Sequence, residues 1–408
     1  MTHAPYVLAM LGSDALSQVH LPLELLLIFG VAKLLANVCE RFKQPGIVGE
    51  ILAGILLGPS VLGWVRPGEV TTALAEMGVL FLLFRVGLEV RASEVLRVGR
   101  IAALVAMLGV AVPFLLGWGF MTVIGFSSIE AVFVGAALVA TSVGITAQVL
   151  AAKGLLDHRA SRVILAAAVI DDVLGLLVLA VASGMAGGSL NVAALITTGV
   201  MAAGFTVLIA VYGSRMLQRV VPRVEKALSV QEGQFDLALV VLFGLSVLAA
   251  FVGVAAIVGA FLAGMALSES VSGRVKDLAH GITELLVPFF LAGIGLHLDI
   301  AVFSKEQTLL MVLAVSGLAI ISKFVGCALG SAALGRADMI RIGVGMIPRG
   351  EVGMVVAQIG LSLGVVERSI YGVVVAMAII TTLVAPPLLS YAYRNCKPRA
   401  EEEEFSLA

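Results

Sequence analysis

Two adjacent carboxylates, Asp171 and Asp172, lie in the middle of a long apolar stretch between Ala160 and Ser183. A carboxylate at the centre of a bilayer costs about 2.5–3.5 kcal/mol even on lenient insertion scales. Acidic side chains at that depth face a partner or a cavity and mark ion or proton pathways. The pair therefore predicts a site for cations or protons inside a membrane.

The two aspartates are expected to have separate partners, because neighbouring residues of a helix point about 100° apart and cannot both face one ligand. One carboxylate would line the cation pathway. The other would pair with Lys323, a basic residue in the middle of a second apolar stretch, 308–333. A static ion pair that only joins two helices is the alternative, but it leaves the second aspartate without a role.

The composition is that of a membrane protein, with 60% hydrophobic and 13% charged residues, whereas soluble domains carry about 25% charged residues. The net charge of −1 argues against binding to nucleic acid. Cys39, Cys327 and Cys396 lack the spacing of a metal site, a disulfide framework or a redox motif. The N-terminal residues lack the basic region of a cleaved signal peptide, so the first apolar helix is expected to stay as an anchor.

Thirteen segments are apolar and long enough to cross a bilayer, which needs about 20 residues. They are 21–39, 46–65, 71–90, 101–124, 129–151, 162–185, 190–214, 233–251, 253–270, 281–299, 308–333, 339–364 and 368–393. With the N-terminus outside, the inner connections hold nineteen basic residues and the outer ones three. Because basic residues concentrate on the cytoplasmic side, this asymmetry predicts a multi-pass protein of the inner (plasma) membrane with its C-terminus inside.

The sequence also contains an internal repeat. The motif IVG-x-x-LAG occurs in Ile47–Leu57 and again in Ile257–Leu267, 210 residues later. A GL pair ends both Phe81–Val90 and Phe289–Leu298, 208 residues apart. Corresponding spans are seven apart, so the copies would run in opposite directions. Such inverted repeats are a common architecture of secondary transporters.

The same offset relates two segments that carry helix-weakening residues in mid-membrane, Leu138–Ala147 and Met346–Val355. Interrupted helices in matching positions point to a binding site, because exposed half-helix ends can face a cavity but not lipid. Close packing of small residues is the alternative for the first segment. In the second, Arg349 and Glu351 are expected to neutralise the partial charges of the two half-helix ends rather than to bind the ion.

Six strings carry a resemblance to a known family: GEILAGILLGP (49–59), FLLFRVGLE (81–89), ALVATSVGITA (137–147), AAVIDDVLGL (167–176), IVGAFLAGM (257–265) and MIPRGEVG (346–353). Through them the chain resembles the monovalent cation:proton antiporter-2 family, and within it the sodium/proton antiporters of the NapA type. The resemblance runs from the second to the twelfth predicted span and so covers nearly the whole chain.

The resemblance implies an all-α polytopic fold of 13 transmembrane helices with inverted repeats and two broken, crossing helices. It also implies a homodimer with elevator-type alternating access. A core (ion-translocation) domain would comprise about 71–185 and 281–364. A dimer or scaffold domain would comprise about 21–65, 233–270 and 368–393, and 190–214 would be a linking helix.

The resemblance further implies site residues. Asp172 would carry the cation or proton, Asp171 would pair with Lys323, and Thr141 and Ser142 would lie near the cation. The expected ligands of Na⁺ are therefore Asp172, Asp171 and Thr141, helped by Ser142 and backbone carbonyls. An Asp-Asp pair with a lysine partner resembles the electrogenic type, which exchanges two protons for one Na⁺.

These features predict a Na⁺(Li⁺)/H⁺ antiporter that serves pH homeostasis, without a cofactor other than the transported ions. The first alternative is a K⁺/H⁺ antiporter, because ligand geometry for Na⁺ and K⁺ cannot be read from sequence. A cation channel is a second alternative. An intramembrane aspartyl protease fits badly, because the two acids of a catalytic dyad must converge on one proton.

Overall fold

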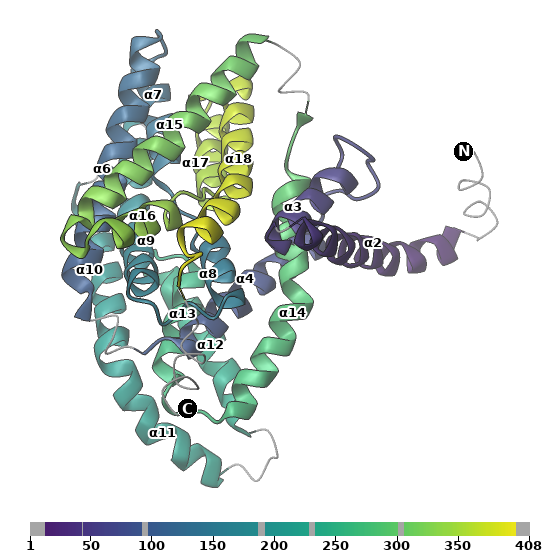
Figure 1. Ribbon diagram of the computed structural model, residues 1–408, viewed down its shortest axis with the longest axis vertical. Coiled ribbons are helices and arrows are strands. Elements are labelled where there is room, and N and C mark those ends of the chain that lie inside the picture. Colours follow the sequence, from purple (N-terminus) through teal and green to yellow (C-terminus); the bar gives the residue numbers. More distant parts are fainter. Residues whose placement is uncertain are drawn as a thin grey trace.

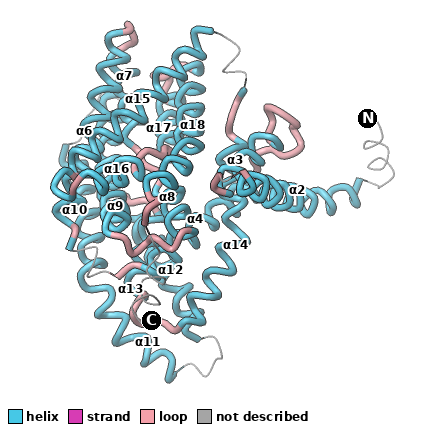
Figure 2. The backbone as a smooth tube through the Cα atoms, in the orientation of Figure 1, coloured by secondary structure: helices cyan, strands magenta, loops and turns pink. Residues whose placement is uncertain are grey.

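The computed structural model describes residues 13–42, 44–91, 97–186, 192–227, 233–300 and 306–396, and this part of the chain is all helical (Figures 1 and 2). The elements are α2 (Ser13–Arg41), α3 (Gly46–Leu57), α4 (Glu69–Glu89), α6 (Gly99–Val123), α7 (Ser128–Val139), α8 (Val143–Ala152), α9 (Arg159–Ala186), α10 (Val192–Leu208), the π-helix η1 (Ile209–Gly213), α11 (Ser214–Ala227), α12 (Gly233–Phe251), α13 (Ala256–Leu267), α14 (Gly273–Leu296), α15 (Glu306–Gly330), the 3₁₀ helix η3 (Ala332–Leu334), α16 (Arg336–Gly345), α17 (Glu351–Ser362) and α18 (Arg368–Ala392).

Within these ranges ten helical segments are long and apolar enough to cross a membrane, which confirms the predicted all-α membrane protein. The other three predicted spans coincide with shorter apolar helices, namely α3, α13 and the pair α16–α17. The prediction of one long helix over 46–65 is wrong. α3 ends at Leu57 because Gly58 adopts an extended conformation and Pro59 follows it. The predicted linking helix is longer than expected, since η1 and α11 continue α10.

The helices pack in two groups. The core group consists of α6, α7, α8, α9 and α15 to α18, in which α6 lies along α15 and α18 packs on α15, α16 and α17. The scaffold group consists of α2, α3, α4, α12, α13 and α14, with α4 packed between α13 and α14. Figure 1 shows α7, α15, α17 and α18 together on one side and α2, α3 and α14 on the other.

This packing favours a division of the chain that differs from the expected one. The sequence-based division put 71–90 and 281–299 in the core and 368–393 in the scaffold. α4 and α14 instead lie against scaffold helices, and α18 lies against the core helices that carry the second interruption. Helices on either side of a boundary cannot be told apart by hydropathy, because all of them are apolar.

Glycines allow α3 and α14 to cross in direct backbone contact. A Cβ atom on Gly54 would overlap the carbonyl oxygen of Ala292, and one on Gly295 would overlap the carbonyl oxygen of Ile51. Because glycine has no side chain, the backbones of α3 and α14 can approach more closely here than they could with any other residue at these two positions. Such close contacts are common where membrane helices cross.

The crossing of α13 and α4 repeats this arrangement. A Cβ atom on Gly264 would overlap the carbonyl oxygen of Phe84, and one on Gly87 would overlap that of Phe261. Each of the four residues lies 208 or 210 positions from its counterpart in the crossing of α3 and α14. The motifs recognised as a repeat in the sequence therefore make equivalent contacts in space.

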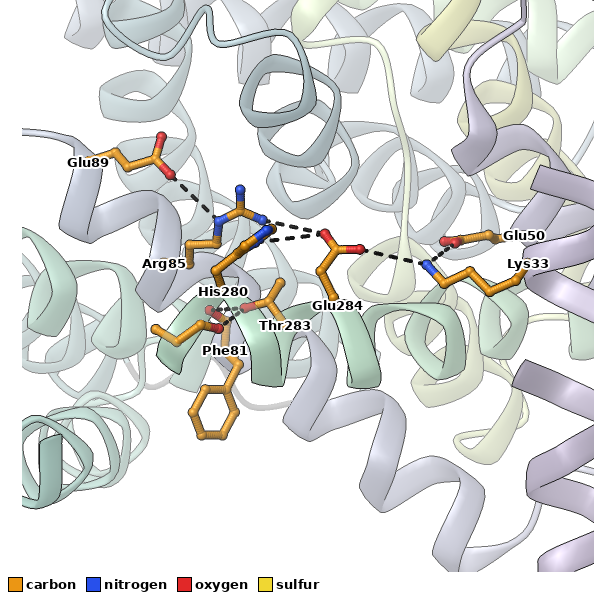
Figure 3. A network of polar contacts seen from close by, with 9 residues as sticks. Lys33, Glu50, Phe81, Arg85, Glu89, His280, Thr283 and Glu284 are labelled. Carbon is orange, nitrogen blue, oxygen red and sulfur yellow. Dashed lines mark hydrogen bonds and ion pairs between the residues drawn. The ribbon is translucent and has the colours of Figure 1, made fainter. Parts of the chain in front are cut away.

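A network of charged side chains joins four scaffold helices (Figure 3). Lys33 of α2 lies 3.0 Å from Glu50 of α3 and 3.8 Å from Glu284 of α14. Arg85 of α4 lies 3.8 Å from Glu284 and 3.6 Å from Glu89, the contact expected from their spacing of four residues. Most of these groups are partly exposed, so each pair adds about 1 kcal/mol or less. Their combined effect is to fix the relative positions of α2, α3, α4 and α14.

Gly264→Ala is expected to lower the free energy of unfolding by about 1–3 kcal/mol, because the new methyl group overlaps a backbone carbonyl that cannot rotate away. Thermal unfolding of the purified protein in detergent measures this. Gly119→Ala in α6 is the matched control, since a Cβ atom there has nothing within 4 Å. Equal melting temperatures for the two variants would contradict the assigned close contact.

Candidate functional site

The two adjacent aspartates lie on α9, which runs without interruption through the core group. Asp171 is 1% exposed and Asp172 is 8% exposed. They face different surroundings, as the helical geometry predicts. Asp171 points into the core group toward α15, whereas Asp172 lines a small cavity at the boundary with the scaffold.

Lys323 of α15 is completely buried and connects Asp171 to the first broken helix. Its Nζ donates to Asp171 Oδ1 at 2.7 Å and to the carbonyl oxygen of Val139 at 2.7 Å. The structure therefore contains the Asp171–Lys323 pair, and the lysine also reaches the end of α7. Removing one member of a buried pair leaves an uncompensated charge at a cost of about 3–5 kcal/mol.

The first interruption separates α7 from α8 at residues 140–142. Thr141 is buried, and its Oγ1 atom has no hydrogen-bond partner among the described residues. The backbone N–H of Ser142 donates to the carbonyl oxygen of Pro348 at 2.8 Å. This bond joins the first interruption directly to the second, so the two broken helices meet at their unwound segments.

The second interruption separates α16 from α17 at residues 346–350 and contains the wholly buried Arg349. The Nη1 atom donates to Ala140 at 3.1 Å and to Met346 at 3.4 Å, and Nη2 donates to Ala319 at 3.2 Å, in each case to the carbonyl oxygen. Ala140 and Met346 directly follow the last residues of α7 and α16, so this geometry supports the charge-compensating role expected for Arg349. Glu351 begins α17, but its side chain lies outside the described part of the structure, and its role stays a prediction.

Protein donors already occupy the carbonyl groups at the ends of α7 and α16. The acceptors and their donors are Val139 with Lys323, Ala140 and Met346 with Arg349, and Gly345 with Thr146, whose Oγ1 donates at 2.6 Å. The contribution of Thr146 is not visible in the sequence, because a threonine in an apolar helix carries no signal of its partner. Thr141 Oγ1 and Asp171 Oδ2, in contrast, have no hydrogen-bond partner within the described residues.

The cavity beside Asp172 is small and otherwise apolar. Its other lining residues come from both helix groups: Leu83 from α4, Val143 from α8, Leu165 and Val169 from α9, and Ile257, Val258 and Phe261 from α13. Val143 directly follows Thr141 and Ser142 in the chain, so the first interruption ends at the wall of this cavity. Asp172 therefore sits where the core group meets the scaffold group.

Two larger cavities also contact α4, one toward its N-terminal end and one at its C-terminal end. A cavity of about 410 Å³ is lined by Ala75, near the start of the helix. A polar cavity of about 600 Å³ is lined by Leu88 and Glu89, at its end. The small cavity of Asp172 lies between them, at Leu83. Along α4, the Asp172 cavity therefore lies between the two larger cavities.

A protein-family model described as "Sodium/hydrogen exchanger, transmembrane" matches residues 26–392. Among curated proteins, the chain is 34% identical to the high-affinity Na⁺/H⁺ antiporter NhaS3 of Synechocystis sp., over 94% of this chain and 92% of that protein. It is 33% identical to the Na⁺/H⁺-K⁺ antiporter GerN of Bacillus cereus, over 91% and 95%.

Solved structures of the sodium proton antiporter MjNhaP1 from Methanocaldococcus jannaschii share the fold. The structure at pH 8 superposes with a TM-score of 0.66 over 92% of this chain and 97% of that chain, at 16% identity. An electron-microscopy structure gives a TM-score of 0.70 over 91% and 94%, at 17% identity.

Lys323→Gln is expected to destabilise the protein by about 3–5 kcal/mol, because it leaves Asp171 charged and buried. The double variant Lys323→Gln/Asp171→Asn should recover part of this loss, since neither charge remains. Thermal unfolding of the two single variants and the double variant measures the coupling. Lys153→Gln, which removes an exposed lysine at the C-terminal end of α8, is the control and should have a small effect. Purely additive effects at Asp171 and Lys323 would argue against the pair.

Proposed function

The chain belongs to the sodium/hydrogen exchanger family, and we propose that it is a secondary-active antiporter that exchanges Na⁺ or Li⁺ for protons. The family is one of transporters, so the protein is not an enzyme. The observation that carries the proposal is the position of Asp172, a buried carboxylate between two cavities, beside the crossing of two broken helices.

In the proposed mechanism, cation and proton compete for Asp172. A carboxylate can bind either one, and binding of one excludes the other, so each return movement carries the opposite ion. The Thr141 hydroxyl would supply a neutral oxygen ligand to Na⁺, and Asp171, next to Asp172 in the chain, pairs with Lys323 of α15 on a different face of α9. Hard monovalent and divalent cations prefer such oxygen ligands.

Alternating access is proposed to come from movement of the core group against the scaffold group, as in an elevator. Asp172 is carried by the core helix α9, while its cavity is closed by α4 and α13 of the scaffold. A shift of the core along α4 would bring the carboxylate from one large cavity toward the other. The charged network of Figure 3 would keep α2, α3, α4 and α14 together as the stationary body.

The remaining features of the proposal follow the resemblance to antiporters of the NapA type. The protein would be a homodimer in the plasma membrane, with thirteen crossings, the N-terminus outside and the C-terminus in the cytoplasm. The distribution of nineteen basic residues on one side and three on the other supports this orientation.

A K⁺/H⁺ antiporter is the second candidate, and one observation favours it: the relative GerN, which matches 91% of this chain, is named as a Na⁺/H⁺-K⁺ antiporter. The two candidates share the site and differ only in the size of the cation that the ligands around Asp172 accept.

Wild-type protein in proteoliposomes is expected to dissipate an imposed pH gradient when Na⁺ or Li⁺ is added, read with a pH-sensitive dye. Asp172→Asn should abolish this response, because a neutral amide cannot exchange a proton for a cation. Asp277→Asn, which removes an exposed aspartate of α14, is the matched control and should remain active. A response to K⁺ alone would favour the second candidate, and cation flux without proton countertransport would favour a channel. An active Asp172→Asn variant would exclude the assigned site.

Transport is expected to be electrogenic, because the Asp171–Lys323 pair offers a second group that can carry a proton. With two protons exchanged for one Na⁺, an imposed membrane potential should accelerate exchange in one direction and slow it in the other. Valinomycin with defined K⁺ gradients sets the potential, and equal K⁺ on both sides provides the zero-potential control. A rate independent of potential would indicate one-for-one exchange.

A further inference from the structure

Two consecutive threonines of α18 form hydrogen bonds with the second interruption. Thr381 and Thr382 are both fully buried, and both contact the backbone of Arg349. The N–H of Arg349 donates to Thr381 Oγ1 at 3.1 Å, and Thr382 Oγ1 donates to the carbonyl oxygen of Arg349 at 2.7 Å. The two hydroxyls thus hold the donor and the acceptor of one unwound residue.

The direction of each hydrogen bond is fixed. The Thr381 hydroxyl donates its only proton to the carbonyl oxygen of Ala378, at 2.9 Å, on its own helix. Its oxygen is therefore left as an acceptor for the N–H of Arg349. Thr382 has the opposite role, since its proton points across to Arg349. Arg349 is completely buried, so both of its backbone groups depend on α18 for their partners.

The position of Arg349 in turn determines the position of the first interruption. Its guanidinium group holds the carbonyl oxygen of Ala140, the residue before Thr141. The neighbouring Pro348 accepts the N–H of Ser142. A continuous chain of hydrogen bonds therefore runs from α18 through the second interruption to the residues expected beside the cation.

We propose that Thr381 and Thr382 form a hydroxyl clamp on Arg349 that positions the crossing of the two broken helices and thereby sets the affinity for the transported cation. The threonines are positioning residues, because they act on the site through Arg349. This inference rests on the proposed antiport function and adds to it that α18, which lies outside the interrupted helices, takes part in tuning the site.

The test measures the apparent KM for Na⁺ and the maximal rate of exchange in proteoliposomes. Thr382→Val keeps the shape of the side chain and removes the hydroxyl, so we expect KM to rise roughly two- to tenfold, the size of effect that one hydrogen bond supplies, with the maximal rate retained. Thr381→Val is a milder variant with the same expected direction, and it serves if Thr382→Val does not fold. Thr382→Ser restores the hydroxyl and should restore the wild-type KM.

Thr283→Val is the matched control. Thr283 is equally buried, but its hydroxyl donates within the scaffold, to the carbonyl oxygen of Ala279 at 2.7 Å. This control shows the effect of losing a buried threonine hydroxyl that is not bound to Arg349. It should leave the KM for Na⁺ unchanged. The ratio of KM for Li⁺ to KM for Na⁺ should change in the two α18 variants and not in this control, because only they alter the ligand geometry.

The outcomes separate the clamp from the antiport proposal. Inactive wild-type protein would overturn the proposed function, whatever the variants do. Active wild-type protein whose KM is unchanged by Thr382→Val and Thr381→Val would overturn the clamp alone. A fall in maximal rate at unchanged KM, an equal effect of Thr283→Val, or failure of Thr382→Ser to restore KM would also overturn it.

Discussion

A helix that is interrupted inside a membrane must find partners for its freed backbone groups, and the organisation of the core follows from this requirement. Most of the unwound residues 140–142 and 346–350 are buried, so the protein supplies hydrogen-bond donors itself. Lys323 and Arg349 provide several of them, and both charges are wholly buried. Buried cations need counter-charges, and α9 supplies one with Asp171, which lies 2.7 Å from Lys323. Lys323 thus joins the carboxylate pair of α9 to the first broken helix.

The scaffold group has a different role, which is to form a rigid surface against the core group that carries Asp172. Glycines at two equivalent crossings let α3 contact α14, and α13 contact α4, backbone to backbone. Direct backbone contact removes flexible side chains from the interface and leaves few ways for the helices to shift. The charged network also links α2, α3, α4 and α14 through the ion pairs of Lys33, Arg85 and Glu284. The face of α4 that closes the cavity of Asp172 is consequently well supported.

The sequence predicts much of this arrangement, because several of its features have few physical explanations. The adjacent acids and the buried lysine predicted the contact between Asp171 and Lys323, and the repeat with a constant offset predicted equivalent elements that make equivalent helix crossings. The end of α3 at Leu57 and the grouping of α4, α14 and α18 were not predicted, since every span is apolar on most faces. Thr146, Thr381 and Thr382 were missed for a related reason. A threonine is unremarkable in a membrane helix until its partner is known, and the partner of each lies far away in the chain.

The orientation of the two aspartates has a consequence for how such a protein can diverge. Asp171 and Lys323 form a pair that is enclosed within the core, whereas Asp172 stands at the border with the scaffold. Substitutions that neutralise the enclosed pair together would preserve the charge balance of the interior and leave the border carboxylate in place. Under the proposed function, the number of charges moved per cycle and the choice of cation would therefore be separable traits. Each could then be altered by a few mutations that leave the other unchanged.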